Sequence, residues 1–307
     1  MVGGMLVAAA LGAPASAQTN PFLGRWDITA TTANETYPLW LEVGEEKGQL
    51  VGFFQDRTGA VRKLPEIARD GSDLVFSTGA PARQGAPKPV YRARIQKGKL
   101  IGALTRGEVT VPWVGVRPPK WKGANASAPH KFGPETALFN GKDLSGWTFQ
   151  FPGQPGGWIV AEGVLTNEKP GNNIISNVQF KDFSLSMEYR VAKDSNSGLY
   201  LRGRYELQVL DDVGKPPALG GHMAVYGRVV PSANASKPPG EWQTVDVTLV
   251  GNRVTVVLNG QKVHDNVAID GITGGALDSD EGAPGPIMIQ GDHSKIWVRH
   301  LVVKPIK

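Results

Sequence analysis

The 307-residue sequence contains no cysteine. A disulfide framework, a zinc-thiolate site and a cysteine nucleophile are therefore excluded. The sequence also lacks any stretch approaching the roughly 20 apolar residues that a membrane-spanning helix requires. It contains no phosphate-binding loop, no nucleophile elbow, no His-Glu-x-x-His motif and no dinucleotide fingerprint. These absences remove several large enzyme classes and predict no membrane span.

Clusters of one charge sign are also missing. The net charge is +5, but the basic excess is scattered through residues 20–122 and is not interleaved with aromatics. A protein that follows a phosphate backbone needs clustered Lys and Arg. The pattern favours a solvated surface, and we expect no nucleic-acid partner.

The N-terminus has features of an export signal. Met5 to Ala10 form a short apolar run, and Ala15-Ser16-Ala17 is a small-x-small cleavage pattern. No Lys or Arg precedes Arg25, so the basic n-region is absent. We expect residues 1–18 to be a signal peptide and the mature protein to be periplasmic or secreted.

No window sustains the 3.6-residue periodicity of a long amphipathic helix. Short runs rich in Val, Ile, Thr and aromatics are separated by turn residues, with 39 Gly and 23 Pro in the chain. This pattern predicts an all-β protein. Residues 118–135, rich in Pro, Ala and polar residues, are predicted to be a linker between domains at 20–117 and 136–307.

The first domain contains strand candidates at 24–30, 38–43, 49–56, 73–78, 89–96, 98–106 and 109–116. So many short strands within about 100 residues indicate a small β-barrel or β-sandwich. The sequence Gly24-Arg25-Trp26-Asp27 is weakly similar to the opening of lipocalin-like barrels. Trp26 is interpreted as a core residue.

The second domain shows strict alternation in 183–191, with apolar odd positions and polar even ones. Further strands are predicted at 199–202 and 205–211. Because short turns join these segments, we expect three antiparallel neighbours sharing one buried face. The opposite face would collect Glu188, Tyr200, Arg202, Glu206 and Gln208, whose side chains suit hydroxyl recognition. A merely solvated outer face is the alternative.

Loop residues near the C-terminus add candidates. His293 lies in the loop after the buried-type strand predicted at 286–290, a position typical of a general base, although a solvated loop histidine is the common case. Extended backbone would direct Asp292 and His293 apart. His222 has the same ambiguity. Asp278 to Gly282 lacks the ligand spacing of a calcium loop and is interpreted as an acidic turn.

A series of ordered motifs then resembles the 3-keto-disaccharide hydrolase domain family over about 137–306. These motifs are Leu138-Phe139-Asn140-Gly141-Lys142-Asp143-Leu144-Ser145-Gly146-Trp147, Trp158, Glu162-Gly163-Val164-Leu165, Phe183 to Tyr189, Asn196 to Gly203, Tyr205 to Asp211, Ala224-Val225-Tyr226-Gly227, Glu241-Trp242-Gln243, Leu258-Asn259-Gly260 and Gly285 to His293. The resemblance implies a concanavalin-like jelly roll that acts on 3-keto glycosides. It also implies a concave site that we expect to include Glu188, Asn196, Tyr200, Tyr205, Gln208, Tyr226, Trp242 and Gln290. One departure is Ser294, where many relatives have Gly.

The implied chemistry requires a base, a proton donor and stabilisation of an enolate. A ketone at C3 acidifies the hydrogen on C2, so a base can remove it and the C1 substituent can leave before water adds. We assign His293 as base, Glu206 as acid/base partner and Arg202 as oxyanion clamp. A divalent metal held by Glu206, Asp211 or His293 is left open.

Two other interpretations are kept. The fold would equally support a non-catalytic carbohydrate-binding module, since fold does not fix function. In a third interpretation the N-terminal domain recognises the substrate and the sandwich is its scaffold.

Overall fold

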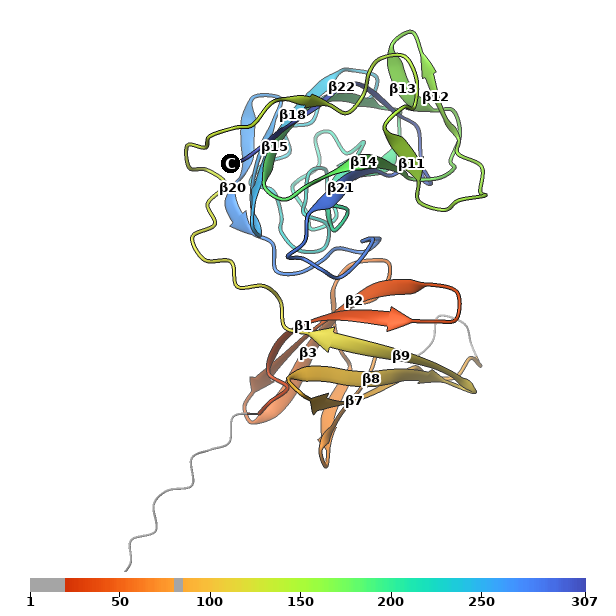
Figure 1. Cartoon of the computed structure of the whole chain (residues 1–307), viewed down its shortest axis with the longest axis vertical. Helices are drawn as coiled ribbons and strands as arrows, with labels where there is room; N and C mark the ends of the chain where they lie inside the picture. Colours follow the sequence, from red (N-terminus) through yellow and green to blue (C-terminus); the bar gives the residue numbers. More distant parts are fainter. Residues whose placement is uncertain (1–19, 80–84) are drawn as a thin grey trace, which may run out of the picture.

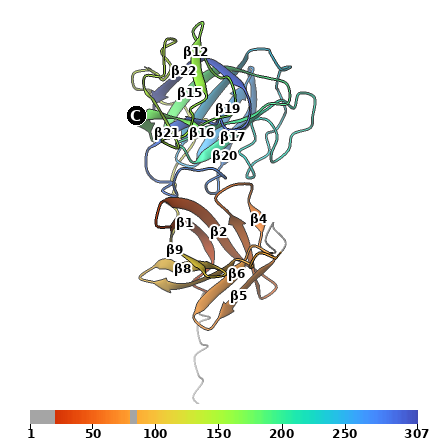
Figure 2. The same cartoon turned by 90° about the vertical axis from the view of Figure 1, so that its right-hand side faces the viewer.

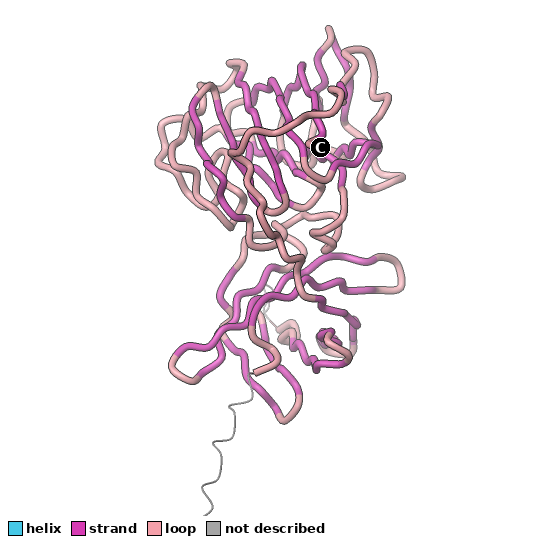
Figure 3. The backbone as a smooth tube through the Cα atoms, turned by 60° about the vertical axis from the view of Figure 1, so that its left-hand side comes forward, coloured by secondary structure: helices cyan, strands magenta, loops and turns pink. Residues whose placement is uncertain are grey.

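The computed structural model describes residues 20–79 and 85–307, and the predicted signal peptide at 1–18 lies outside them. Export therefore stays a prediction. The described part of the chain contains strands and no helix, which confirms the all-β class (Figure 3). A helix suited to crossing a membrane is thus not found among these residues.

The N-terminal domain is one antiparallel sheet of nine strands in the order β4-β3-β2-β1-β9-β8-β7-β6-β5 (Figures 1 and 2). The first strand, β1, pairs with the last, β9, and this pairing joins the two halves of the domain into one sheet. The strands are β1 (Gly24–Thr31), β2 (Thr36–Glu46), β3 (Gln49–Gln55), β4 (Arg62–Lys63), β5 (Glu66–Asp70), β6 (Asp73–Ser77), β7 (Val90–Gln96), β8 (Lys99–Arg106) and β9 (Val109–Val116). The sequence predicted all but the short β4 and β5.

Large aromatic side chains fill the core of this domain. Phe76 and Tyr91 stack with ring centroids 4.6 Å apart, and Phe54 packs against both. Trp26 and Trp113 are also almost fully buried. Trp26 is therefore a core residue, as predicted.

The C-terminal domain is a sandwich of two antiparallel sheets, which confirms the jelly-roll prediction (Figure 1). The larger sheet contains β10 (Thr136–Ala137), β12 (Trp158–Ala161), β13 (Val164–Asn167), β15 (Phe183–Val191), β18 (Gln243–Val250), β19 (Arg253–Leu258), β20 (Gln261–Ala268) and β22 (Ile296–Pro305). The smaller has the order β11 (Trp147–Phe149), β14 (Ile174–Phe180), β21 (Gly285–Ile289), β16 (Asn196–Leu201) and β17 (Tyr205–Leu210). Apolar side chains of both sheets form one core.

The expected three-strand neighbourhood of β15, β16 and β17 is corrected. β16 pairs with β17, but β15 pairs with β18 and β22 in the other sheet. The loop between Val191 and Asn196 therefore crosses between the layers. Since the apolar faces of both sheets point inward, their polar faces lie on opposite sides of the sandwich.

Residues 118–135 contain no strand and connect the two domains, but they are not a free linker. Trp121 packs against Gly251, and Ala126 N donates to Asn266 Oδ1 at 2.8 Å. The segment is therefore held against the C-terminal domain, which we had not expected from its composition.

The two domains are docked through buried contacts. Arg228 lies 4.0 Å from the ring centroid of Trp40, and Trp40 also leaves no space for a side chain at Gly271. Ion pairing of Arg25 with Asp270 at 2.6 Å adds a polar contact at the margin. Because Trp40 is only 1% exposed, this docking surface positions the N-terminal domain firmly.

A buried pair of carboxyl groups, Asp27 and Glu281, crosses this interface. Asp27 of β1 shares a hydrogen bond with Glu281, and burial, followed by repulsion from Glu281, raises the pKa of Asp27 well above its ordinary value despite nearby Arg228 and Arg25. Tyr205 Oη donates to Glu281 at 2.6 Å. In the folded protein Asp27 is therefore protonated at neutral pH.

We predict that the melting temperature falls as pH rises from about 6 to 9, by several degrees. An acid whose pKa is raised by folding makes the folded state less stable as pH rises, because the unfolded chain releases the proton at lower pH than the folded chain does. Asp27→Asn should flatten the dependence, since asparagine does not ionise. Calorimetry across this pH range measures it, with Asp246→Asn, at an exposed position of β18, as control. An unchanged slope in Asp27→Asn would contradict the assignment.

Candidate active site

A cavity of about 480 Å³ lies over the polar face of the five-stranded sheet and is bounded by the N-terminal domain. Its volume falls within the range of about 300–1,000 Å³ typical of small-molecule sites. The C-terminal domain contributes Gln150, Phe151, Asn173, Ile175, Asn196, Tyr200, Glu206, Gln208, Tyr226, Gly274 to Leu277, Gln290, Asp292 and His293. The N-terminal domain contributes Glu35 to Pro38 and Arg57 to Gly59.

The register of β16 and β17 groups the polar residues at the floor of this cavity. Tyr200 is directly opposite Glu206, and Gly198 is opposite Gln208. Because side chains alternate along a strand, these even-numbered positions share one face while Leu199 and its odd neighbours enter the core. The alternation in the sequence predicted this face correctly for both strands.

Glu206 is enclosed by its neighbours on the sheet. Tyr200 donates through its hydroxyl to the Gly274 carbonyl at 2.9 Å. With its amide nitrogen facing acceptors, Gln208 donates to Glu206 Oε1 at 3.1 Å and to the Ser197 carbonyl at 3.2 Å. The Glu206 carboxyl lies directly over Gly198, where a Cβ would overlap it.

Burial makes Glu206 a proton donor at neutral pH. Only 4% of the residue is exposed, and this desolvation raises the pKa of Glu206 to about 8, against the opposing effect of the Tyr200 hydroxyl and with a further contribution from the negative charge of Asp292. A carboxyl group with a pKa near 8 is mostly protonated at pH 7. It can therefore act as a general acid.

Gly198 offers a test of this arrangement. We predict that Gly198→Ala displaces the Glu206 side chain and lowers activity more than tenfold while the fold is kept, because the obstructed atoms belong to side chains. Turnover and melting temperature should be measured together. Gly133→Ala is the control, since its nearest neighbour lies 3.6 Å from the added Cβ. Full activity in Gly198→Ala would mean that the carboxyl position does not matter.

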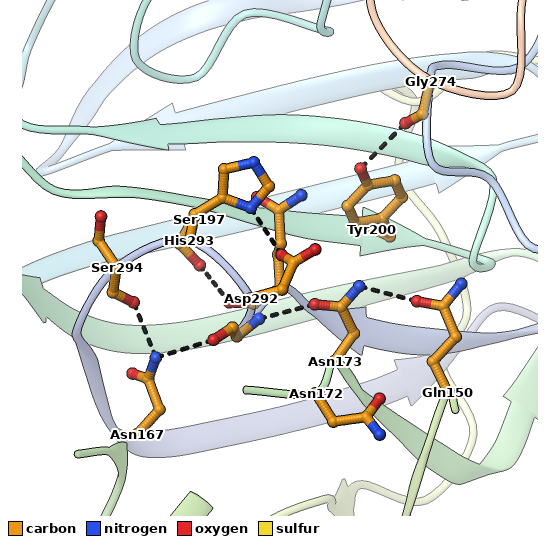
Figure 4. Close-up of polar contacts among 12 residues, drawn as sticks. Gln150, Asn167, Asn172, Asn173, Ser197, Tyr200, Gly274, Asp292, His293 and Ser294 are labelled. Atoms are coloured by element: carbon orange, nitrogen blue, oxygen red, sulfur yellow. Dashed lines mark hydrogen bonds and ion pairs between the residues drawn. The ribbon is translucent and has the colours of Figure 1, made fainter. Parts of the chain in front are cut away.

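The loop that follows β21 is held by the side chains of two asparagines from outside the loop. Asn173 Oδ1 accepts from Gly291 N at 2.8 Å and its Nδ2 donates to Gln150 Oε1 at 2.7 Å (Figure 4). Asn167 Nδ2 donates to the carbonyls of Gly291 at 3.2 Å and Ser294 at 2.8 Å. These two asparagines hold both ends of the loop that presents His293.

Asp292 and His293 are joined directly, with Oδ1 and Nδ1 2.6 Å apart (Figure 4). The bend at this point replaces the extended backbone that would have directed them apart. A carboxylate only accepts, so the shared hydrogen belongs to Nδ1, and Nε2 of the neutral ring keeps its lone pair. Both side chains are half exposed and line the same cavity as Glu206.

Three further predicted residues line the cavity. Asn196 belongs to β16, Tyr226 to the loop after β17, and Gln290 immediately follows β21. The buried Oδ1 of Asn196 has no hydrogen-bond partner among the described residues. A buried polar atom of this kind is uncommon in folded proteins, and here it belongs to a residue that lines the cavity.

The structure corrects the role of oxyanion clamp that we expected for Arg202. β16 ends at Leu201, and Arg202 adopts a left-handed φ of 54°. Its side chain is fully buried between Trp121 and Tyr205 and donates to the Gly251 carbonyl. The turn breaks the alternation, so the guanidinium does not line the cavity and cannot clamp a bound sugar there.

Three other expected site residues also lie elsewhere. Tyr205 occupies an odd-numbered position of β17, so its side chain enters the core, where its hydroxyl donates to Glu281. Glu188 pairs with Arg299 at 2.5 Å on the outer face of the other sheet. The guanidinium of Arg299 lies 4.1 Å from the ring centroid of Trp242, which places Trp242 on that same face. None of the three lines the cavity.

The expected metal ligands do not converge either. Asp211 accepts from Asp194 N at 2.9 Å and is not a lining residue. Within 20–79 and 85–307, no three His, Asp or Glu side chains are arranged to hold a metal ion. The set Glu206, Asp211 and His293 therefore does not fit a metal, and the chemistry below is derived from side chains alone.

Sequence reasoning missed several other residues that line the cavity. Asp292 was not selected because extended backbone would direct it away from His293, and Gln150 and Asn173 lie outside the predicted strands. Arg57 and Glu35 belong to the other domain. Only the three-dimensional arrangement brings these residues together.

Residues 134–304 match the family described as the 3-keto-alpha-glucoside-1,2-lyase-like domain. A comparison with curated proteins finds no significant match. A proposed glycosyl hydrolase from Parabacteroides distasonis is 31% identical, over 56% of this chain and 83% of that one, with a TM-score of 0.49. A second from the same organism is 22% identical over 56% and 94%, with a TM-score of 0.46. The carbohydrate-binding module CBM66 from Bacillus subtilis is 16% identical over 50% and 93%, with a TM-score of 0.33.

The family match spans more than half of the chain, and the motifs that it includes are those that form the cavity floor. The protein is therefore a carbohydrate-active member of the 3-keto-alpha-glucoside-1,2-lyase-like domain family.

Proposed function

We propose that this protein cleaves 3-keto glycosides by removing the proton on C2, expelling the C1 substituent and hydrating the product. The observation that carries the proposal is the presence, in one cavity, of a buried carboxyl with a pKa near 8 and an Asp-oriented imidazole. The carboxyl can supply the acid, and the imidazole, whose Nδ1 is held by Asp292, can supply the base that an elimination requires.

In the first step His293 Nε2 takes the proton from C2. The electron pair of the broken C–H bond forms the C2=C3 double bond, and the C3 oxygen becomes an enolate. Asp292 stabilises the imidazolium that results. With Arg202 buried elsewhere, we assign the amides of Asn196 and Gln290 to the keto oxygen, because both line the cavity.

In the second step the enolate reforms the C3 ketone and a C1=C2 double bond, and the C1–O bond breaks. The leaving oxygen takes its proton from Glu206, which becomes a carboxylate. Hydration reverses the roles: Glu206 takes a proton from the water that adds to C1, and protonated His293 returns one to C2. The sum is hydrolysis, with both groups restored for the next turnover.

The test compares oxidised and unoxidised substrates. We expect release of the C1 substituent from methyl 3-keto-glucoside and none from methyl glucoside, because only the ketone acidifies C2. Cleavage of both at similar rates would indicate ordinary glycoside hydrolysis. Binding of both without any release would favour the carbohydrate-binding module.

A further inference from the structure

The N-terminal domain, which lies outside the family match, supplies one wall of the cavity. Its contribution comes from the β1–β2 turn with the start of β2, at 35–38, and from the loop after β3, at 57–59. Figures 1 and 2 show these strands beneath the smaller sheet of the sandwich. A domain that only tethered the enzyme would have no reason to line its cavity.

This wall is fixed in place. Gly275 N donates to the Arg57 carbonyl at 2.9 Å. Gly274 lies so close to the backbone of Gly59 that a Cβ would not fit. Together with the docking of Trp40, these contacts hold the backbone at Arg57 at a defined position relative to the sandwich.

The wall also contacts the segment that the Tyr200 hydroxyl binds. Tyr200, which faces Glu206 across the strands, donates to Gly274, and this segment in turn contacts Arg57 and Gly59. The loop of His293 is held by Asn167, at the end of β13, and by Asn173, immediately before β14. The N-terminal wall is therefore connected, through Gly274 and Tyr200, to the strand pair that carries Glu206.

The chemistry of the wall suits a neutral polyol. Arg57 Nη1 and Nη2 donate to the two carboxylate oxygens of Glu35 at 2.6 and 2.7 Å, which cancels the net charge of the pair. Both side chains remain nearly half exposed. Arg57 also lies 5.2 Å from the ring centroid of Tyr37. Adjacent donors and acceptors beside an aromatic ring match vicinal hydroxyls on a sugar ring.

We propose that Glu35, Tyr37 and Arg57 form the subsite for the leaving group, and that this leaving group is a neutral second sugar. The inference rests on the proposed function, because Glu206 must protonate the oxygen that joins the two rings. Beyond that oxygen, the leaving group extends toward the N-terminal domain. That domain thus selects disaccharides over simple glycosides.

The experiment uses Arg57→Gln in the full chain, which keeps the backbone bond to Gly275. Loss of charge-assisted hydrogen bonds to a ligand costs about tenfold or more. We expect KM for a 3-keto disaccharide to rise by this factor, with kcat/KM for methyl 3-keto-glucoside unchanged. Arg92→Gln, which breaks a similar exposed pair with Asp70, is the control. Equal losses on both substrates, or no loss on either, would overturn the subsite.

Calorimetry with unoxidised ligands separates this inference from the proposed function. The wild type should bind a disaccharide at least tenfold more tightly than methyl glucoside, and Arg57→Gln should remove that preference. If this holds and neither keto substrate is cleaved, the subsite stands and the proposed function fails. If the keto substrates are cleaved but the wild type shows no preference for the disaccharide, the subsite is wrong.

Discussion

Replacing Glu206 by glutamine should lower kcat/KM for a 3-keto glucoside by about 10²–10⁴-fold, the range for losing a general acid. Glutamine keeps the shape and burial of the side chain but cannot donate a proton to the leaving oxygen. The wild-type kcat/KM should also fall as pH rises through about 8, because the Glu206 pKa is raised to that value and the carboxylate formed above it no longer donates. Glu206→Gln should lack this decline.

Steady-state kinetics between pH 6 and 10 measure both effects. Glu188→Gln is the matched control, because this carboxylate lies on the outer face of the opposite sheet, paired with Arg299. Its kcat/KM should stay within about twofold of the wild type. Persistence of the alkaline decline in Glu206→Gln would assign it to another group and remove Glu206 from the proton-donor role.

The second large effect is expected at the loop after β21. His293→Ala should lower turnover by about 10²–10⁴-fold, because the base that removes the C2 proton is lost. Asp292→Asn should have a smaller effect, about 10–100-fold, the range found when a histidine at a metal site loses the partner that orients it. Asparagine can present its amide to Nδ1 and so no longer selects the tautomer with a free Nε2.

His300→Ala provides the matched control for His293, since His300 is an exposed histidine on β22. The measurement is turnover of methyl 3-keto-glucoside by His293→Ala, Asp292→Asn and His300→Ala. Wild-type turnover in His293→Ala would exclude its imidazole as the base. An effect of Asp292→Asn larger than that of His293→Ala would show that the aspartate acts on the substrate itself.

The sequence was sufficient for the parts of the site that depend on strand alternation. Tyr200, Glu206 and Gln208 lie on one face because the two-residue period of a strand leaves no other arrangement once Leu199 and Leu207 are buried. The same reasoning failed for Arg202, one residue beyond the end of β16, where a left-handed turn ends the period. Periodicity predicts a side chain's direction only while the strand continues.

Sheet assignment was a separate difficulty. The alternation in β15 was predicted correctly, but alternation does not reveal which sheet a strand joins. The short loop at 192–195 was compatible with a hairpin or with a crossing between layers, and the chain crosses. Glu188 was consequently expected beside Glu206, although the two carboxylates lie on opposite sides of the sandwich.

The cavity wall from the N-terminal domain was beyond sequence reasoning for a physical reason. Arg57 and Glu35 follow no pattern that differs from an ordinary surface ion pair. Their position depends on the docking of Trp40 against Gly271 and Arg228, more than 180 residues later in the chain. Long-range packing of this kind leaves no local periodicity to read.

The central claim is that His293 takes the C2 proton and Glu206 protonates the leaving group over the same sugar ring. Exchange of the C2 hydrogen in heavy water, followed by NMR on methyl 3-keto-glucoside, tests it most directly. Glu206→Gln should introduce deuterium at C2 while releasing little methanol, and His293→Ala should do neither. Exchange at C2 by His293→Ala at the rate shown by Glu206→Gln would contradict the account.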